Sequence, residues 1–183
     1  MKNACIFHGS SSSPEHFWYP YVKRELEKRG YKTWVPQLPD TDNPDLKTQL
    51  PFVLNNYSYN NETVLIGHSA GCPLILSLLQ NLEVKIKLAI LVAGLTEPPD
   101  DKPAPILQSE YDWKEISSNC NNFVFINSDN DPWGCDDKQG RKMFDHLGGE
   151  LIIRHGEGHM GSESFNQPYK EFPLIVNLVK SFE

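Results

Sequence analysis

The sequence predicts an α/β fold, in which a parallel sheet of about six strands has helices packed on both faces. Short apolar segments alternate with longer amphipathic segments along all 183 residues. The apolar run within residues 87–92 is continuous, as is typical of parallel strands buried on both faces. No internal repeat, linker or low-complexity segment interrupts the alternation. We therefore expect a single, doubly wound domain over residues 1–183, with right-handed crossovers.

The first half of the chain is expected to contain three strands and three helices. Trp18, Val22 and Leu26 recur at helical spacing, and Gly30 is a typical helix stop. Pro73 opens an apolar run, and proline suits the first turn of a helix. The expected strands span residues 3–7, 31–38 and 63–66, and the expected helices span residues 17–29, 46–56 and 73–82.

The second half continues the alternation after one long irregular segment. Residues 94–111 contain four prolines, and a loop of this length in a compact domain is either disordered or functional. The sequence leaves open whether this loop forms a lid. The expected strands span residues 87–92, 122–127 and 150–155, and the expected helices span residues 113–118, 136–147 and 169–182.

Composition and charge exclude several classes of partner. A formal net charge of -7 argues against a general nucleic-acid binder and gives no basic patch for an anionic membrane. The first apolar run, residues 4–7, is too short for a signal peptide or a spanning helix, so we expect a cytoplasmic protein. The four cysteines have no CxxC spacing and are expected to be free thiols: Cys5, Cys72, Cys120 and Cys135.

The motif Gly67-x-Ser69-x-Gly71 lies between an expected strand and an expected helix. This is the context of a nucleophile elbow, a sharp turn that exposes a strained serine above the sheet. Glycine fits two positions before and after the serine because it has no Cβ. The serine hydroxyl would stand at the positive end of the following helix. The alternative is a Gly/Ser turn without chemistry.

Other strand-end loops supply the partners that a serine nucleophile needs. A serine hydroxyl requires a base, and an imidazole base is oriented by a carboxylate. Ligands of an open parallel sheet meet the carboxyl ends of its strands, and the loops there carry Asp131 and His159. Serine, then aspartate, then histidine is the chain order of this hydrolase architecture. The predicted catalytic triad is therefore Ser69, His159 and Asp131.

Both partners have rivals in the sequence. His155 lies at a strand end, where it could pack or cap, and His146 falls inside an expected helix. Asp129 competes with Asp131, and either could be a turn residue. Pro132 stiffens the loop directly after Asp131, which favours that carboxylate.

The oxyanion hole is predicted to consist of the backbone N–H groups of Ser10 and Ala70. Ser11 is the alternative to Ser10. His8 is expected to shape the turn after the first strand. His68, inside the elbow, is expected to line the cleft and not to react.

No metal ion or other cofactor is expected. His155 and His159 have a zinc-like spacing, but two glycines intervene and no HExxH helix exists. Gly9 and the serines after it lack the Gly-Lys-Ser/Thr of a phosphate-binding loop. The expected partner is a small-molecule acyl substrate, and Trp113 and Trp133 are candidates for lining its pocket.

With these motifs the chain resembles the small α/β-hydrolases of the retinoblastoma-binding-protein-nine type. The resemblance covers nearly the whole length. It rests on Phe17-Trp18-Tyr19 with residues 22–27, Gly67-His68-Ser69-Ala70-Gly71, residues 111–116, residues 128–132 and Gly158-His159. It implies a three-layer α/β-hydrolase fold with a six-stranded sheet, and it implies Ser69, Asp131 and His159 as the triad.

The sequence departs from this family in two places. The name-giving member binds retinoblastoma protein through a Leu-x-Cys-x-Glu sequence, whereas residues 54–58 here read Leu-Asn-Asn-Tyr-Ser, so that partner is not expected. Residues 132–135 read Pro-Trp-Gly-Cys, where relatives usually place an aliphatic residue and a proline. The wall beside Asp131 is therefore expected to differ.

These observations together predict a serine hydrolase of the carboxylesterase type. It would cleave a small acyl ester, or a related amide or thioester, through an acyl-enzyme. The alternative is a binding protein on a hydrolase scaffold, since fold does not fix function. A further hypothesis is that acidic residues around the cleft attract cationic substrates. The alternative is that these residues only form a solvated acidic surface. The candidates are Asp100, Asp101, Asp129, Asp136 and Asp137.

Overall fold

The computed structural model describes residues 1–99 and 103–183, and its strands form one parallel sheet. The strands are β1 (Asn3–Phe7), β2 (Lys32–Trp34), β3 (Thr63–His68), β4 (Leu88–Val92), β5 (Phe123–Ser128) and β6 (Glu150–Arg154). Their order in the sheet is β2-β1-β3-β4-β5-β6, and every neighbouring pair is parallel. The predicted α/β fold with about six parallel strands is confirmed.

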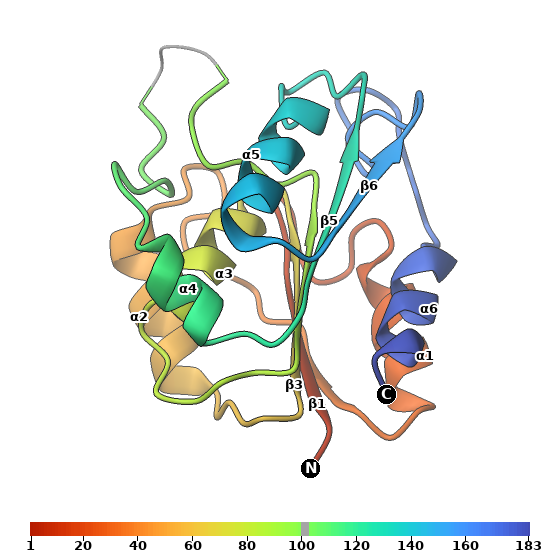
Figure 1. The fold of residues 1–183 in the computed structure, drawn as a ribbon. Coiled ribbons are helices and arrows are strands. Elements are labelled where there is room, and N and C mark those ends of the chain that lie inside the picture. The colour runs from red at the N-terminus through yellow and green to blue at the C-terminus, as the bar shows by residue number, and fades with distance from the viewer. Residues whose placement is uncertain (100–102) are drawn as a thin grey trace.

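Helices cover both faces of this sheet. They are α1 (Tyr19–Glu27), α2 (Leu46–Asn56), α3 (Gly71–Leu79), α4 (Trp113–Ser118), α5 (Asp137–Leu147) and α6 (Pro173–Ser181). Figure 1 shows α1 and α6 together on one face and the other four helices on the opposite face. Among the described residues, no helix has both the length and the apolar character needed to cross a membrane.

The sheet separates two hydrophobic cores. Alternate residues of a strand point to opposite faces, so Ala4 and Ile6 join the core beneath α1 and α6, while Cys5 and Phe7 join the other core. Every residue of β1, β3, β4 and β5 is buried, which explains their continuous apolar runs. All nine residues of α3 are buried as well, because α3 packs on the sheet between α2 and α4.

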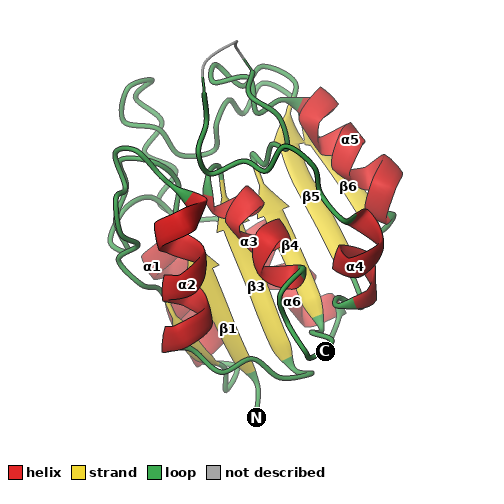
Figure 2. Ribbon diagram, turned by 90° about the vertical axis from the view of Figure 1, so that its left-hand side faces the viewer, coloured by secondary structure: helices red, strands yellow, loops and turns green. Residues whose placement is uncertain are grey.

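The loops that follow the strands meet at one edge of the sheet, as Figure 2 shows. The register between β1 and β3 pairs Phe7 with Gly67, and the register between β3 and β4 pairs His68 with Val92. The loops after these three strands therefore begin at the same level. The fold thus brings residues from distant parts of the sequence to one place.

Several element boundaries differ from the prediction by one to three residues, and the two largest differences, of four residues each, are explained by proline. The second strand was expected over residues 31–38 but covers only Lys32–Trp34; Pro36, which has no N–H for a sheet ladder, lies beyond its end. The last helix was expected from residue 169 but begins at Pro173. The residue before a proline avoids helical geometry, and Phe172 lies outside the helical region, with φ -141° and ψ 73°. The described residues within 94–111 form neither helix nor strand.

Candidate active site

Ser69 occupies the sharp turn between β3 and α3 that its sequence motif predicts. Its φ is 53°, a left-handed conformation that is strained for a residue with a side chain. The turn is fixed by a hydrogen bond of 2.9 Å from the Ser69 N–H to the Val92 carbonyl at the end of β4. The strain is therefore supported by the sheet.

The two glycines of the motif are required by contact with the backbone. A Cβ on Gly71 would lie 2.2 Å from the carbonyl oxygen of Phe7, and a Cβ on Gly67 would lie 2.9 Å from backbone atoms of Gly71. Real Cβ atoms essentially never approach other heavy atoms below 3.0 Å. The spacing of the motif thus follows from the close approach of α3 to β1 and β3.

The loop after β1 reaches Ser69. A Cβ on Gly9 would lie 2.9 Å from Ser69 Cβ, so this loop passes directly over the turn. Ser10 and Ala70 line the same cavity as Ser69. Within the described part of the chain, neither the Ser10 N–H nor the Ala70 N–H donates to a protein acceptor, which leaves both available to a ligand.

Ser11, the alternative oxyanion donor, is already engaged. Its N–H donates to the Thr41 carbonyl at 2.7 Å, and its φ is 48°. This hydrogen bond favours Ser10 over Ser11 as a donor. His8 shapes the turn, as expected: Nδ1 donates to the Gly9 carbonyl at 2.9 Å, and Nε2 accepts from the Leu38 N–H at 3.1 Å. Burial lowers the pKa of His8, so the imidazole is neutral and can make both bonds.

Asp131 and His159 lie on neighbouring loops, after β5 and β6, and form a buried pair. His159 Nδ1 and Asp131 Oδ2 are 2.7 Å apart, and the two side chains are 7% and 0% exposed. The other carboxylate oxygen of Asp131 accepts from the Trp133 N–H at 2.8 Å. Because both oxygens are engaged, Asp131 is held as an acceptor for the Nδ1–H tautomer of His159.

The backbone of His159 is fixed as firmly as its ring. Its N–H donates to Gln167 Oε1 at 2.9 Å, and its carbonyl accepts from His68 Nε2 at 2.9 Å. The next carbonyl, that of Met160, accepts from Trp18 Nε1 at 3.0 Å. Among the described residues, Nε2 is the one polar atom of His159 without a protein partner, and His159 lines the cavity that Ser69 also lines.

His68 does more than line the cleft. It is almost fully buried, and Nδ1 lies 2.7 Å from the hydroxyl of Tyr19. Burial lowers the pKa of His68 to about 3, helped by the nearby His159. The neutral ring therefore carries its proton on Nε2, donates to the His159 carbonyl and accepts from Tyr19. This chain of hydrogen bonds connects α1, the elbow and the His159 loop.

The loops after β5 and β6 are aligned by three successive side chains. Asp129 Oδ1 accepts from the Gly156 N–H at 2.9 Å, and Asn130 Oδ1 accepts from the Gly158 N–H at 2.8 Å. Asp131 then reaches His159 as described above. Asn130 thereby fixes Gly158, the residue before His159. The φ of Gly158 is +58°.

The alternative histidines and the alternative aspartate make contacts elsewhere. His155 is exposed and lies 2.5 Å from Asp129, which raises the pKa of His155. Hydrogen bonds from Gly156 and His155 hold the pKa of Asp129 below its usual value. His146 stacks on Trp113 outside the cavity, with ring centroids 4.4 Å apart. Trp113 is therefore not a pocket residue, whereas Trp133 is.

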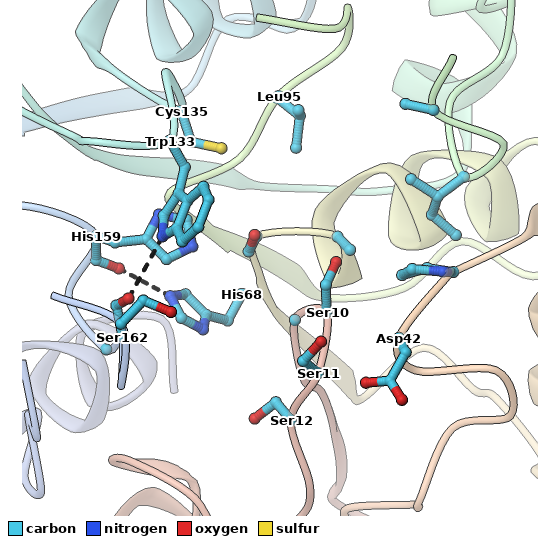
Figure 3. A pocket seen from close by; sticks show the side chains of 18 of the residues that line it. Ser10, Ser11, Ser12, Asp42, His68, Leu95, Trp133, Cys135, His159 and Ser162 are labelled. Carbon is cyan, nitrogen blue, oxygen red and sulfur yellow. Dashed lines mark hydrogen bonds between the residues drawn. The ribbon is translucent and has the colours of Figure 1, made fainter. Parts of the chain in front are cut away.

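The loops enclose a cavity of about 670 Å³ above Ser69. Figure 3 shows Trp133, Cys135 and His159 on one side of it, Asp42 on the opposite side, and Ser10 between them. The described part of the loop over residues 94–111 forms an apolar wall: Leu95, Pro99, Pro103, Ala104, Pro105 and Ile106. The acidic lining residues among those described are Asp42 and Glu163.

Of the five acidic residues expected around the cleft, the three that the structure describes do not line the cavity. Asp100 and Asp101 lie outside the described residues. Asp129 is engaged by His155, and Asp136 caps α5 by accepting from the Lys138 N–H at 3.0 Å. Neither of them lines the cavity, nor does Asp137. The carboxylates of the cavity are instead Asp42 and Glu163, which no motif distinguishes from other loop residues.

Cys135 occupies the cavity wall beside the Asp131–His159 pair. It lines the same cavity as Ser69. Burial and the neighbouring Asp131 raise the pKa of Cys135 well above its usual value, so it is a neutral thiol. In the described part of the chain, no hydrogen bond joins Ser69 Oγ to His159 Nε2, a contact that is often loose in hydrolases without substrate.

The sequence alone did not identify Gln167, Asn130 or His68 as supports of the site. Gln167 acts through a side chain on a loop with no motif, and a Cβ on Gly158 would meet its amide nitrogen at 1.8 Å. Asn130 could have been noticed as the middle residue of three polar residues after a buried strand. The role of His68 depends on Tyr19, a contact between distant parts of the chain.

Comparison with known proteins agrees with this arrangement. The family model described as serine hydrolase matches residues 4–181. YdeN of Bacillus subtilis (strain 168) is 28% identical over 189 residues, which cover 99% of this chain and 96% of YdeN. Serine hydrolase RBBP9 of Rattus norvegicus is 24% identical over 180 residues, which cover 94% of this chain and 90% of RBBP9.

Solved structures show the same fold. The crystal structure of the B. subtilis ydeN gene product matches with a TM-score of 0.90 at 22% identity, covering 100% of this chain and 98% of that one. Est1E from Butyrivibrio proteoclasticus, with ferulic acid bound, matches with a TM-score of 0.71 at 14% identity, covering 100% of this chain and 88% of Est1E. These structural likenesses establish the fold alone. With the family model matching nearly its whole length, the chain belongs to the serine hydrolase family, as a small member of the RBBP9 type.

Proposed function

We propose that the protein is a carboxylic ester hydrolase with Ser69 as nucleophile, His159 as general base and acid, and Asp131 as the orienting carboxylate. The observation that carries the proposal is the buried His159–Asp131 pair of 2.7 Å on the cavity that holds Ser69. The pair fixes the proton of His159 on Nδ1. Nε2 is then free to take the proton of a serine hydroxyl.

The reaction proceeds in two halves. Ser69 Oγ attacks the ester carbonyl while its proton passes to His159 Nε2, and the oxyanion is held by the N–H groups of Ser10 and Ala70. The tetrahedral intermediate collapses as the imidazolium gives its proton to the leaving alcohol. Water then repeats the sequence on the acyl-enzyme and releases the acid, which regenerates Ser69.

The cavity supports a small ester with an apolar part. Its volume of about 670 Å³ lies in the range of small-molecule sites. The proline-rich wall, formed by Leu95, Pro99 and residues 103–106, offers apolar surface, as does the half-exposed Trp133. Ser10, Ser11 and Ser12 offer hydroxyl groups. We infer that the apolar portion of the substrate packs against the proline-rich wall.

Steady-state hydrolysis of short p-nitrophenyl esters tests this proposal. Ser69→Ala is expected to lower kcat by roughly 10⁶, the size of effect seen when a protease triad loses its nucleophile. Ser118→Ala, on the exposed surface of α4, is the matched control and should retain full activity. Ordinary ester turnover by pure Ser69→Ala would contradict the assignment. A folded wild type that turns over no member of an ester panel would favour a binding role instead.

A further inference from the structure

Cys135 lies in the wall of the proposed active site, and the proposed mechanism gives it no part. Its Sγ, a carboxylate oxygen of Asp131 and one imidazole nitrogen of His159 all lie within 4.8 Å of one another. Cys135 is 3% exposed, and the Asp131 side chain is fully buried. Cys135 and His159 both line the cavity, which gives a ligand access to the group.

Thiol, imidazole and carboxylate together form a donor set that suits zinc. Zinc binds these groups at about 2.0–2.3 Å, and zinc sites with an open position use three protein ligands. Donor atoms around such an ion lie roughly 3.3–3.7 Å apart, by tetrahedral geometry from those bond lengths. Separations of up to 4.8 Å therefore need to close by at most about 1.5 Å, and if Nδ1 is the ligand nitrogen its 2.7 Å contact with Asp131 opens by about 1 Å.

The thiol is held in place by its backbone. The buried Asn127 side chain donates to the Cys135 carbonyl at 2.9 Å, and Gly134 makes the turn before it with φ +72°.

We propose that Asp131, Cys135 and His159 form a binding site for a thiophilic divalent cation such as zinc, and that the bound cation inhibits hydrolysis. On binding, the Cys135 S–H bond breaks, its proton passes to solvent, and a metal–thiolate bond forms. One imidazole nitrogen binds the ion, and the ring proton resides on the other nitrogen. Whichever nitrogen binds, Nε2 has no free lone pair for the Ser69 proton.

The two parts of this proposal depend on different things. Metal binding depends on the geometry of the three donors alone. Inhibition rests on the proposed function, because it requires His159 to be the base. A bound metal is here an inhibitor and not a cofactor, since the mechanism proceeds through the serine without it.

Cobalt(II) binding tests the site without reference to activity. Titration of reduced protein with Co²⁺, in the absence of oxygen, should produce a thiolate-to-cobalt charge-transfer band in wild type and equally in Ser69→Ala. The band should be lost in Cys135→Ser and in Cys135→Ala, but kept in Cys120→Ser, which removes another buried thiol far from the cavity. Absence of the band in wild type, or its persistence in both Cys135 variants, would overturn the site.

Inhibition by Zn²⁺ is then measured on ester hydrolysis. Each variant is compared with its own metal-free rate, and EDTA should restore the rate. Cys135→Ser and Cys135→Ala should each raise the half-inhibitory Zn²⁺ concentration at least tenfold relative to Cys120→Ser. Equal inhibition of all variants would overturn the proposal by placing the metal elsewhere. A cobalt band in an enzyme that zinc does not inhibit would instead contradict the assignment of His159 as base.

Discussion

Asp131 accepts two hydrogen bonds, one from His159 and one from the Trp133 backbone. Asp131→Asn is expected to lower kcat by about 10⁴, because an amide that donates to Nδ1 favours the wrong tautomer of His159. Ester kinetics measure the effect. Asp129→Asn is the matched control: this carboxylate faces His155 outside the cavity, and its loss should cost less than about tenfold. Equal losses in the two variants would contradict the assignment.

Asn130 is expected to position His159 without touching substrate. Asn130→Ala removes the acceptor for the Gly158 N–H and lets the histidine loop shift, and a misplacement of about 1 Å can cost roughly 10² in rate. The loss should appear in kcat with KM nearly unchanged. Asn130→Asp keeps an acceptor oxygen and should restore most of the rate. Failure of Asp to rescue would argue against a positioning role.

The elbow glycines determine how two elements pack, because they allow α3 to approach β1 closely. Gly71→Ala is expected to destabilise the fold by roughly 3 kcal/mol or more, because its Cβ would meet the Phe7 carbonyl at 2.2 Å. Gly30→Ala is the control, with φ +83° but open space around it, and should cost about 1–2 kcal/mol. Urea unfolding measures both, and equal costs would contradict the packing argument.

Much of this arrangement could be predicted from the sequence because its signals are local. The helices over residues 46–56 and 113–118 were predicted with the bounds observed, and the elbow motif located Ser69. The supports of His159 could not be predicted, because Gln167 lies on a loop with no motif and His68 lies 91 residues away in the chain. Asp42 and Glu163 could not be predicted as cavity residues either, because only the fold brings them to the cavity.

At the scale of the whole molecule, buried neutral histidines predict how stability depends on pH. The unfolded state binds a proton on His68 below its ordinary pKa of about 6.5, whereas the folded state does so only near 3. Unfolding therefore takes up protons, and stability rises with pH between these values. Wild type should lose about 2 kcal/mol more than His68→Gln between pH 7 and pH 5.

Urea unfolding of both proteins at the two pH values provides the measurement. The comparison cancels the contribution of His8, whose pKa is also lowered by burial and which is unchanged in the variant. A parallel pH dependence in wild type and His68→Gln would show that His68 is not held neutral.

The charge of the molecule and of its cavity predicts substrate preference. The chain carries a net charge of -7, and the described lining residues include Asp42 and Glu163 but no lysine or arginine. At low salt, a cationic ester should show roughly tenfold higher kcat/KM than an anionic ester of the same size. The ratio should shrink in 1 M salt and in the double variant Asp42→Asn/Glu163→Gln. Equal kcat/KM values at low salt would contradict this preference.

The most direct measurement of the central claim is fluorophosphonate labelling read by intact mass, on wild type and on Ser69→Ala. An activated serine is phosphonylated at its Oγ, whereas an ordinary serine hydroxyl is a weak nucleophile and does not react. We predict a single adduct on wild type and none on Ser69→Ala. No adduct on folded wild type, or an adduct that persists in Ser69→Ala, would contradict the claim that Ser69 is the activated nucleophile of this hydrolase.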